Sequence, residues 1–226
     1  MNHVLDRPVW SALASRHAAL ATGSGPARRY RSPIHPFAAT VDDSRESLAG
    51  LAGLASSGET LIILQADAFV APPGFAVSMT ADAVQMVATR DMAEVDDPRI
   101  EQLGEADAAE MLELATLTKP GPFTLKAQAL GGFWGVREDG RLIAMAGERL
   151  KMDGLTEVSG VCTHPDFRGQ GLGRLLTLYV AGRVSAMGEI PFLHTYAANA
   201  TAIALYEKIG FALRTRMNVA ALERLP

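Results

Sequence analysis

A glycine-rich segment, Arg168-Gly169-Gln170-Gly171-Leu172-Gly173, has the residue types and spacing of a phosphate site. It follows an apolar, strand-like run that stops before Pro165, and leucines at helical spacing come after it. The first N–H groups of a helix have no partners within the helix, and the helix dipole adds partial positive charge there. Glycines let an anion approach such a backbone closely, and Arg168 and Arg174 add positive charge. The segment is therefore a candidate phosphate site at a strand-to-helix turn.

The spacing of the glycines narrows the range of phosphate-containing ligands that this segment could bind. The dinucleotide pattern G-x-G-x-x-G would need glycine at position 174 if it began at Gly169, and Arg174 stands there. The P-loop pattern G-x-x-x-x-G-K-[ST] does not occur. What remains is R-x-x-G-x-G, on Arg168, Gly171 and Gly173. By itself this pattern is equally compatible with a plain strand-to-helix turn.

A second segment, residues 199–211 (NATAIALYEKIGF), supports the first. Asn199 is a favoured N-cap and Gly210 a favoured residue after a helix end, so a short helix is expected with Tyr206 near its C-terminus. In this order and at this separation, the two segments resemble the signature of the GNAT superfamily of acyl-CoA N-acyltransferases. The resemblance covers roughly residues 81–225. The alanine-rich first third is similar to the partial, non-catalytic half found in a two-subdomain branch related to glycine N-acyltransferases.

The resemblance implies an α/β fold with a mixed central sheet and with acetyl-CoA as acyl donor. The donor would lie between two parallel strands that splay apart, here Leu155–Thr163 and Ile190–Tyr196. An amine would attack the thioester directly, backbone donors at a strand bulge would polarise its carbonyl, and no metal is implied. The residues expected to contact the cofactor are Val161, Cys162 and Thr163 through their main chain, and Arg168, Gly169, Gln170, Gly171, Leu172, Gly173, Arg174, Asn199, Ala202 and Tyr206.

Three side chains are candidates for proton transfer. The resemblance implies that Tyr206 is the acid that protonates the leaving thiolate; the alternative is a tyrosine of the core. His194 could be the general base, because imidazole titrates near neutral pH, or simply a hydrogen-bonded strand residue. Glu157 corresponds to a water-linked glutamate of other members, although its position favours a solvated charge at a strand end. Cys162 could suggest a nucleophile, but a small residue in a buried strand is the better interpretation.

The loop over residues 119–132 is long and irregular, which is often a functional feature. We expect it to line the acceptor pocket together with Trp134; a plain surface connection is the alternative.

The elements that position these residues can be outlined from periodicity and turn signals. Strands are expected over residues 60–64, 83–89, 133–136, 141–149 and 211–221, in addition to the two splayed strands, and helices over residues 9–21, 44–55 and 105–116. The stretch Ala71-Pro72-Pro73-Gly74 is the clearest linker. It divides the chain into an N-terminal, non-catalytic subdomain over residues 1–75 and a catalytic domain over residues 76–226.

Composition limits the functional classes. A chain of 226 residues with 48% hydrophobic and 20% charged residues is typical of a globular protein. Its net charge of -4 disfavours nucleic acid as a partner. The single cysteine, the absence of a signal-like start and of a long apolar run favour a cytoplasmic monomer or homodimer that does not bind membranes. We expect a small-molecule amine as acceptor. A protein or peptide acceptor, and a non-catalytic acyl-CoA-binding regulatory module, are the alternatives.

Overall fold

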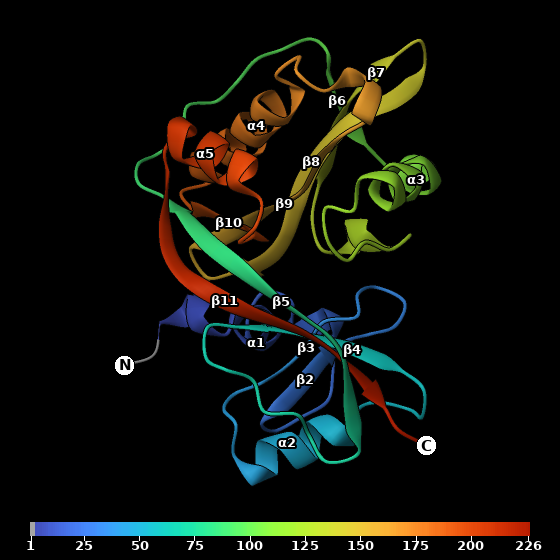
Figure 1. Ribbon diagram of the computed structural model, residues 1–226. Coiled ribbons are helices and arrows are strands. Elements are labelled where there is room, and N and C mark those ends of the chain that lie inside the picture. The colour runs from blue at the N-terminus through green and yellow to red at the C-terminus, as the bar shows by residue number, and fades with distance from the viewer. Residues whose placement is uncertain (1–2) are drawn as a thin grey trace.

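The structure is a computed structural model that describes residues 3–226 (Figure 1). Its centre is a mixed eight-stranded sheet in the order β4-β11-β5-β10-β9-β8-β7-β6. Strands β9 and β10 run parallel, and the other neighbouring pairs are antiparallel. The expected α/β class with a mixed sheet is therefore confirmed. The strands are β4 Thr60–Gln65, β5 Phe75–Ala88, β6 Ile100–Leu103, β7 Phe133–Glu138, β8 Arg141–Met152, β9 Leu155–Thr163, β10 Ile190–Tyr196 and β11 Phe211–Arg224.

Helices cover both faces of the sheet around β8 and β9 (Figure 1). Helix α4 (Leu172–Ala186) buries Leu176 and Val180 against one face, beside α5 (Ala200–Ile209). Helix α3 (Ala108–Thr118) buries Met111 against the other face. Each face thus has its own apolar layer, and β9 is held between them.

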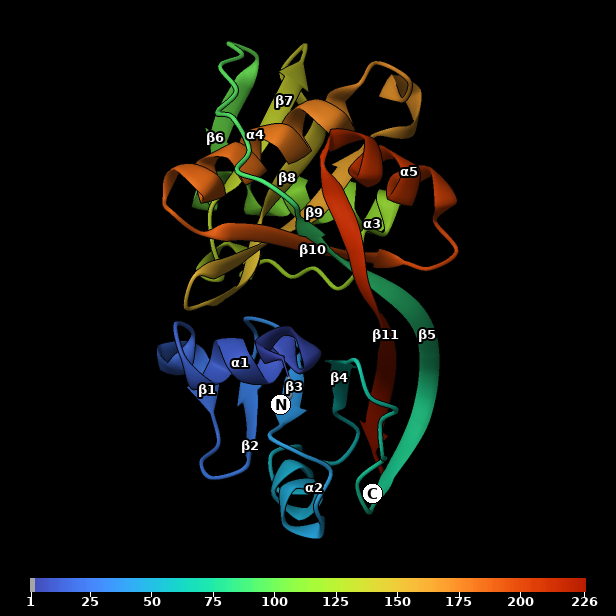
Figure 2. The same cartoon turned by 90° about the vertical axis from the view of Figure 1, so that its left-hand side faces the viewer.

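The N-terminal part packs against the other end of the sheet (Figure 2). It contains α1 (Pro8–Ala14), a small sheet of β1 (Ala21–Thr22), β2 (Ala27–Tyr30) and β3 (Ala38–Thr40), and α2 (Arg45–Ala52). Short 3-10 turns are η1 Val4–Asp6, η2 Ala18–Leu20, η3 Glu105–Asp107, η4 Ala127–Ala129 and η5 Pro165–Phe167. Strands β5 and β11 run from one part to the other (Figure 2), and β4 joins the same sheet through β11. The division after residue 75 remains a proposal.

Two of the expected elements differ most in their bounds. Strand β5 begins at Phe75, eight residues earlier than expected, because it pairs with β11 along almost its whole length. The helix expected over residues 9–21 ends at Ala14, because Ser15 leaves helical geometry. The chain then turns, and Nδ1 of His17 lies 2.7 Å from the hydroxyl oxygen of Tyr30. Tertiary contacts thus override the helix propensity of the alanines.

No helix of the described residues is long and apolar enough to cross a membrane.

Candidate active site

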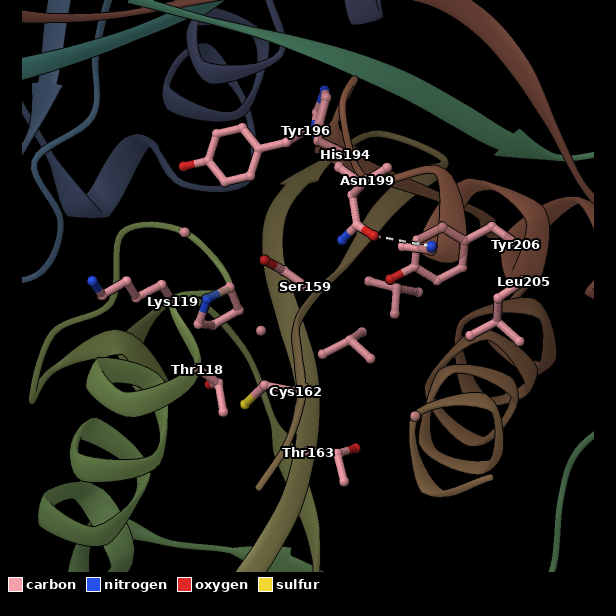
Figure 3. A pocket seen from close by; sticks show the side chains of 18 of the residues that line it. Thr118, Lys119, Ser159, Cys162, Thr163, His194, Tyr196, Asn199, Leu205 and Tyr206 are labelled. Atoms are coloured by element: carbon pink, nitrogen blue, oxygen red, sulfur yellow. Dashed lines mark hydrogen bonds between the residues drawn. The ribbon is translucent and has the colours of Figure 1, made fainter. Parts of the chain in front are cut away.

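Strands β9 and β10 separate along their length, which opens the site. They pair only over Leu155–Glu157 with Ile190–Phe192. Beyond that point β9 continues to pair with β8, while β10 continues to pair with β5. The splay expected of these two strands is therefore confirmed. A pocket of about 830 Å³ lies here, and Figure 3 shows side chains of both strands around it.

A bulge in β9 lies in the wall of this pocket. Cys162 faces Met145 and Ser159 faces Gly147, so Gly160 and Val161 together oppose one residue of β8. Gly160 has φ +63°, a conformation that residues with a side chain rarely adopt. A bulge leaves backbone groups without ladder partners, and here they border the pocket. Such groups can donate to a carbonyl oxygen bound between the strands.

The glycine-rich segment forms the turn that leads into α4. Gly169 and Gly171 have φ +80° and +79°, and Gly171 is the N-cap of the helix. A Cβ added at Gly171 would meet nothing within 4 Å, so space for a ligand remains open beside it. Arg168 and Arg174 form no ion pair within residues 3–226. The turn therefore offers free backbone N–H groups and two cations to an anion.

The structure brings nearly all of the expected cofactor contacts around one pocket. Those that line the pocket are Val161, Cys162, Thr163, Arg168, Gly169, Gly171, Leu172, Gly173, Arg174, Asn199, Ala202 and Tyr206. Gln170 is exposed and does not line it. Their assignment as cofactor contacts remains a proposal.

Tyr206 is positioned by the caps of α5. Asn199 accepts a hydrogen bond from the backbone N–H of Ala202 at 3.1 Å, and Gly210, at φ +111°, ends the helix. Tyr206 is 7% exposed, and its hydroxyl points into the pocket (Figure 3). Burial, with a smaller contribution from Cys162, raises the pKa of Tyr206 to about 12. The phenol therefore keeps its proton at neutral pH.

Glu157 is fully buried, so the interpretation as a solvated charge is wrong. Arg149 donates to its carboxylate from Nε at 2.9 Å and from Nη2 at 2.6 Å. His194 donates from Nδ1 to Oε1 at 2.7 Å, and the backbone N–H of Leu150 donates at 3.2 Å. Burial alone would raise the pKa of Glu157, but Arg149 and His194 hold it well below its usual value. Both carboxylate oxygens are occupied.

His194 lines the pocket, and both of its ring nitrogens have partners. Its Nε2 lies 2.8 Å from Nε2 of Gln85 on β5. The amide oxygen of Gln85 accepts from Arg214, and its nitrogen donates to the backbone oxygen of Leu5 at 3.0 Å. The same nitrogen is therefore the donor toward His194. Neutral His194 carries its proton on Nδ1, where it bonds Glu157, and Nε2 is its basic nitrogen.

Cys162 faces away from the proton-transfer groups. Figure 3 shows its sulfur pointing toward Thr118 of α3, while Tyr206 lies on the other side of β9. Burial raises the pKa of the Cys162 thiol to about 11. A thiol of this kind is a poor nucleophile. The geometry agrees with its interpretation as a small buried strand residue.

The far end of the pocket was not predicted from the sequence. Its lining comes from the N-terminal part and from the long strands: Phe37, Ile62, Leu64, Met79, Ala83 and Val219. Alternation within β4 could have shown that Ile62 and Leu64 share a face. It could not have shown that this face meets residues more than a hundred positions away.

The irregular loop over residues 119–132 lines the pocket only in part. Lys119, Pro120, Gly121 and Pro122 line the pocket. Trp134 does not, so this expectation is wrong: it is buried on the other face, where its ring lies 5.8 Å from that of Tyr179 on α4. The reason is the two-residue alternation of β7, which directs Phe133 toward α3 and Trp134 toward α4.

Comparison with known proteins agrees with this geometry. A family model described as FR47-like protein matches residues 133–219. A solved structure of a protein assigned to the GNAT family of acetyltransferases, from Novosphingobium aromaticivorans DSM 12444, is 42% identical, with 100% of both chains covered and a TM-score of 0.93. A GCN5-related N-acetyltransferase from Kribbella flavida is 17% identical and shares the fold, with a TM-score of 0.59 over 98% of this chain and 94% of that chain.

Among curated relatives, the [ribosomal protein bS18]-alanine N-acetyltransferase of Salmonella typhimurium is 36% identical over 74 residues. This match covers 32% of the chain and 49% of that enzyme, so it spans about half the length of the relative. The full-length similarity at 42% identity is the finding that decides the family. The chain belongs to the GNAT family of acyl-CoA-dependent N-acyltransferases.

Proposed function

We propose that this protein transfers an acetyl group from acetyl-CoA to a primary amine by direct attack of the amine on the thioester. One observation carries the proposal. The splayed strands, the glycine-rich turn and the hydroxyl of Tyr206 all border one continuous pocket. That arrangement can bind an anionic cofactor and place a general acid, Tyr206, beside it.

In this proposal the pyrophosphate of acetyl-CoA lies on the N-terminus of α4, between Arg168 and Arg174. The main chain of residues 161–163 pairs with the pantetheine amides, and the bulge at Gly160 donates to the thioester oxygen. Asn199 and Ala202 contact the cofactor arm at the start of α5.

The chemical step forms a bond between nitrogen and the carbonyl carbon and breaks the bond between carbon and sulfur. The leaving thiolate takes the proton of Tyr206, whose raised pKa keeps that proton available. The attacking nitrogen, positively charged after bond formation, then loses its second proton to the Tyr206 phenolate, which restores the phenol. The ammonium of the acceptor gives its proton to Nε2 of His194, and Glu157 stabilises the imidazolium that forms. Glu157 thus orients His194, while Gln85 must release Nε2 before the proton arrives.

The proposal is tested by following free thiol with acetyl-CoA and a panel of primary amines, with mass spectrometry of the products. We expect thiol release that depends on the amine, together with an acetylated product. Binding of acetyl-CoA without thiol release for any amine would instead support a non-catalytic acyl-CoA-binding module.

A peptide acceptor is the second candidate, favoured by the similarity to the bS18-alanine N-acetyltransferase. The panel therefore includes short peptides with a free N-terminal alanine beside small amines. A kcat/KM higher for the peptides than for every small amine would favour the second candidate.

A further inference from the structure

The far end of the pocket has its own chemistry, distinct from that of the cofactor arm. We propose that it is an apolar acceptor subsite that selects a small primary amine with an extended apolar chain and no second positive charge. This inference rests on the proposed acetyl transfer, because it names the acceptor class of the same site.

The floor of this subsite is one face of three neighbouring strands. Register aligns Leu64 of β4 with Val219 of β11 and then with Ala81 of β5. The adjacent row aligns Ile62, Ala221 and Met79. Side chains of residues paired directly across antiparallel strands lie on the same face. The opposite face, with Leu61, Ile63, Ala220 and Leu222, packs against Leu51 of α2.

The subsite is long. Ala83 pairs with Tyr196 at the end of β10, so one end of the floor lies beside the splayed strands. Met79 also lines the pocket, four residues further along β5. At about 3.3 Å per residue this is a strip of about 13 Å. Phe37 borders this strip. The guanidinium of Arg149 lies over its ring, with Cζ of Arg149 5.0 Å from the ring centroid of Phe37.

The charges around the subsite explain why the acceptor should carry no second positive charge. Over the described part of the chain, none of the residues that line the pocket is Asp or Glu. The charged residues near the acceptor end are Lys119 and Arg149, and the partner of Arg149, Glu157, is fully buried behind the lining. A second ammonium of the acceptor would lose hydration here and gain no carboxylate. Diamines and polyamines are therefore poor acceptors.

Met79 gives a sharp test because it lines the strip and is 40% exposed, so a polar side chain there does not enter the core. Val77 is the matched control: it lies on the same strand, is 44% exposed and does not line the pocket. Linear primary alkylamines of increasing length and a diamine of matched length serve as probes. Calorimetric binding to the complex with CoA is measured beside thiol release with acetyl-CoA.

For the unaltered protein we expect affinity to rise by about fourfold per methylene until the strip is filled, and the diamine to bind at least tenfold more weakly than the matched monoamine. Met79→Glu should weaken binding of the long monoamine by at least tenfold and strengthen that of the diamine. Val77→Glu should change neither, and the affinity for acetyl-CoA should be the same in all three proteins.

Affinity that does not depend on chain length, or equal effects of the two substitutions, would overturn the subsite. So would tighter binding of peptides than of every alkylamine. Length-dependent binding without thiol release would uphold the subsite and instead defeat the proposed acetyl transfer, so the two failures are distinguishable.

Discussion

Gln85 donates a hydrogen bond from its side-chain nitrogen to Nε2 of His194 over 2.8 Å. The same amide is fixed by Arg214, which in turn pairs with Asp6 at 2.6 Å. The basic nitrogen of a pocket residue is thus connected to the N-terminal part through three side chains. Because Glu157 holds the other ring nitrogen, the tautomer of neutral His194 is determined by its surroundings.

Replacing His194 tests its role as general base. We expect His194→Gln, which keeps polar groups in the same space, to lower kcat by about 10²-fold or more. Initial rates at saturating substrates measure this loss.

His194→Ala serves as the second variant, and its loss should be of similar size. If either variant keeps the kcat of the unaltered protein, the proton passes to another acceptor, such as a water chain. Binding of acetyl-CoA, measured by calorimetry, should be unchanged in both.

Replacing Tyr206 tests its role as the general acid. Tyr206→Phe removes the proton that the thiolate would take, so we expect kcat to fall by about 10²-fold while the affinity for acetyl-CoA is kept. Since its pKa is raised to about 12, Tyr206 should cause no alkaline fall in rate below about pH 11. Tyr179→Phe is the matched control, because Tyr179 packs against Trp134 and does not line the pocket. Equal kcat for both variants would remove Tyr206 from the mechanism.

The two ends of α4 offer a matched test of the phosphate site. Gly171 precedes the helix at φ +79° and Gly188 follows it at φ +76°, and a Cβ at either would meet nothing within 4 Å. Valine at either position should therefore cost a similar strain, about 1–2 kcal/mol of stability in urea unfolding. We expect Gly171→Val alone to abolish calorimetric binding of acetyl-CoA. Binding that survives in Gly171→Val would contradict the pyrophosphate assignment.

The local parts of the site could be predicted from the sequence because their signals are local. The bounds of β9 and β10 are as expected, since each is an apolar run between turn residues. The N-cap Asn199 and the glycine after α5 mark the two ends of this helix, so the sequence alone places Tyr206 near its C-terminus. These features need no knowledge of distant contacts.

The partners of these residues could not be predicted in the same way. Gln85 and His194 are 109 positions apart, and only the pairing of β5 with β10 brings them together. Glu157 is expected at the surface from its neighbours in sequence, but the turn between β8 and β9 folds Arg149 back onto it. Strand β5 begins directly after a Pro-Pro-Gly stretch and has a long partner only in β11.

Two buried histidines of the N-terminal part predict how stability depends on pH. Burial, helped by Lys151, lowers the pKa of His17 to about 4, and burial with Arg149 lowers that of His35 to about 3. Both are neutral in the folded protein at pH 5, whereas in the unfolded chain they bind protons below about pH 6.5. The unfolded state then holds more protons, so stability is full above pH 6.5 and falls as the pH decreases.

We expect the free energy of unfolding to fall by up to about 2.7 kcal/mol per pH unit between pH 6 and 5, which corresponds to uptake of two protons. Carboxylates with lowered pKa values lose most of their contribution below about pH 4.5, so the histidines dominate the slope in this window. Urea unfolding at pH 7, 6, 5.5 and 5 gives the slope. His17→Gln should reduce the slope to about half, because one of the two histidine protons is removed. A flat profile over this range would show that both imidazoles are already protonated in the folded protein.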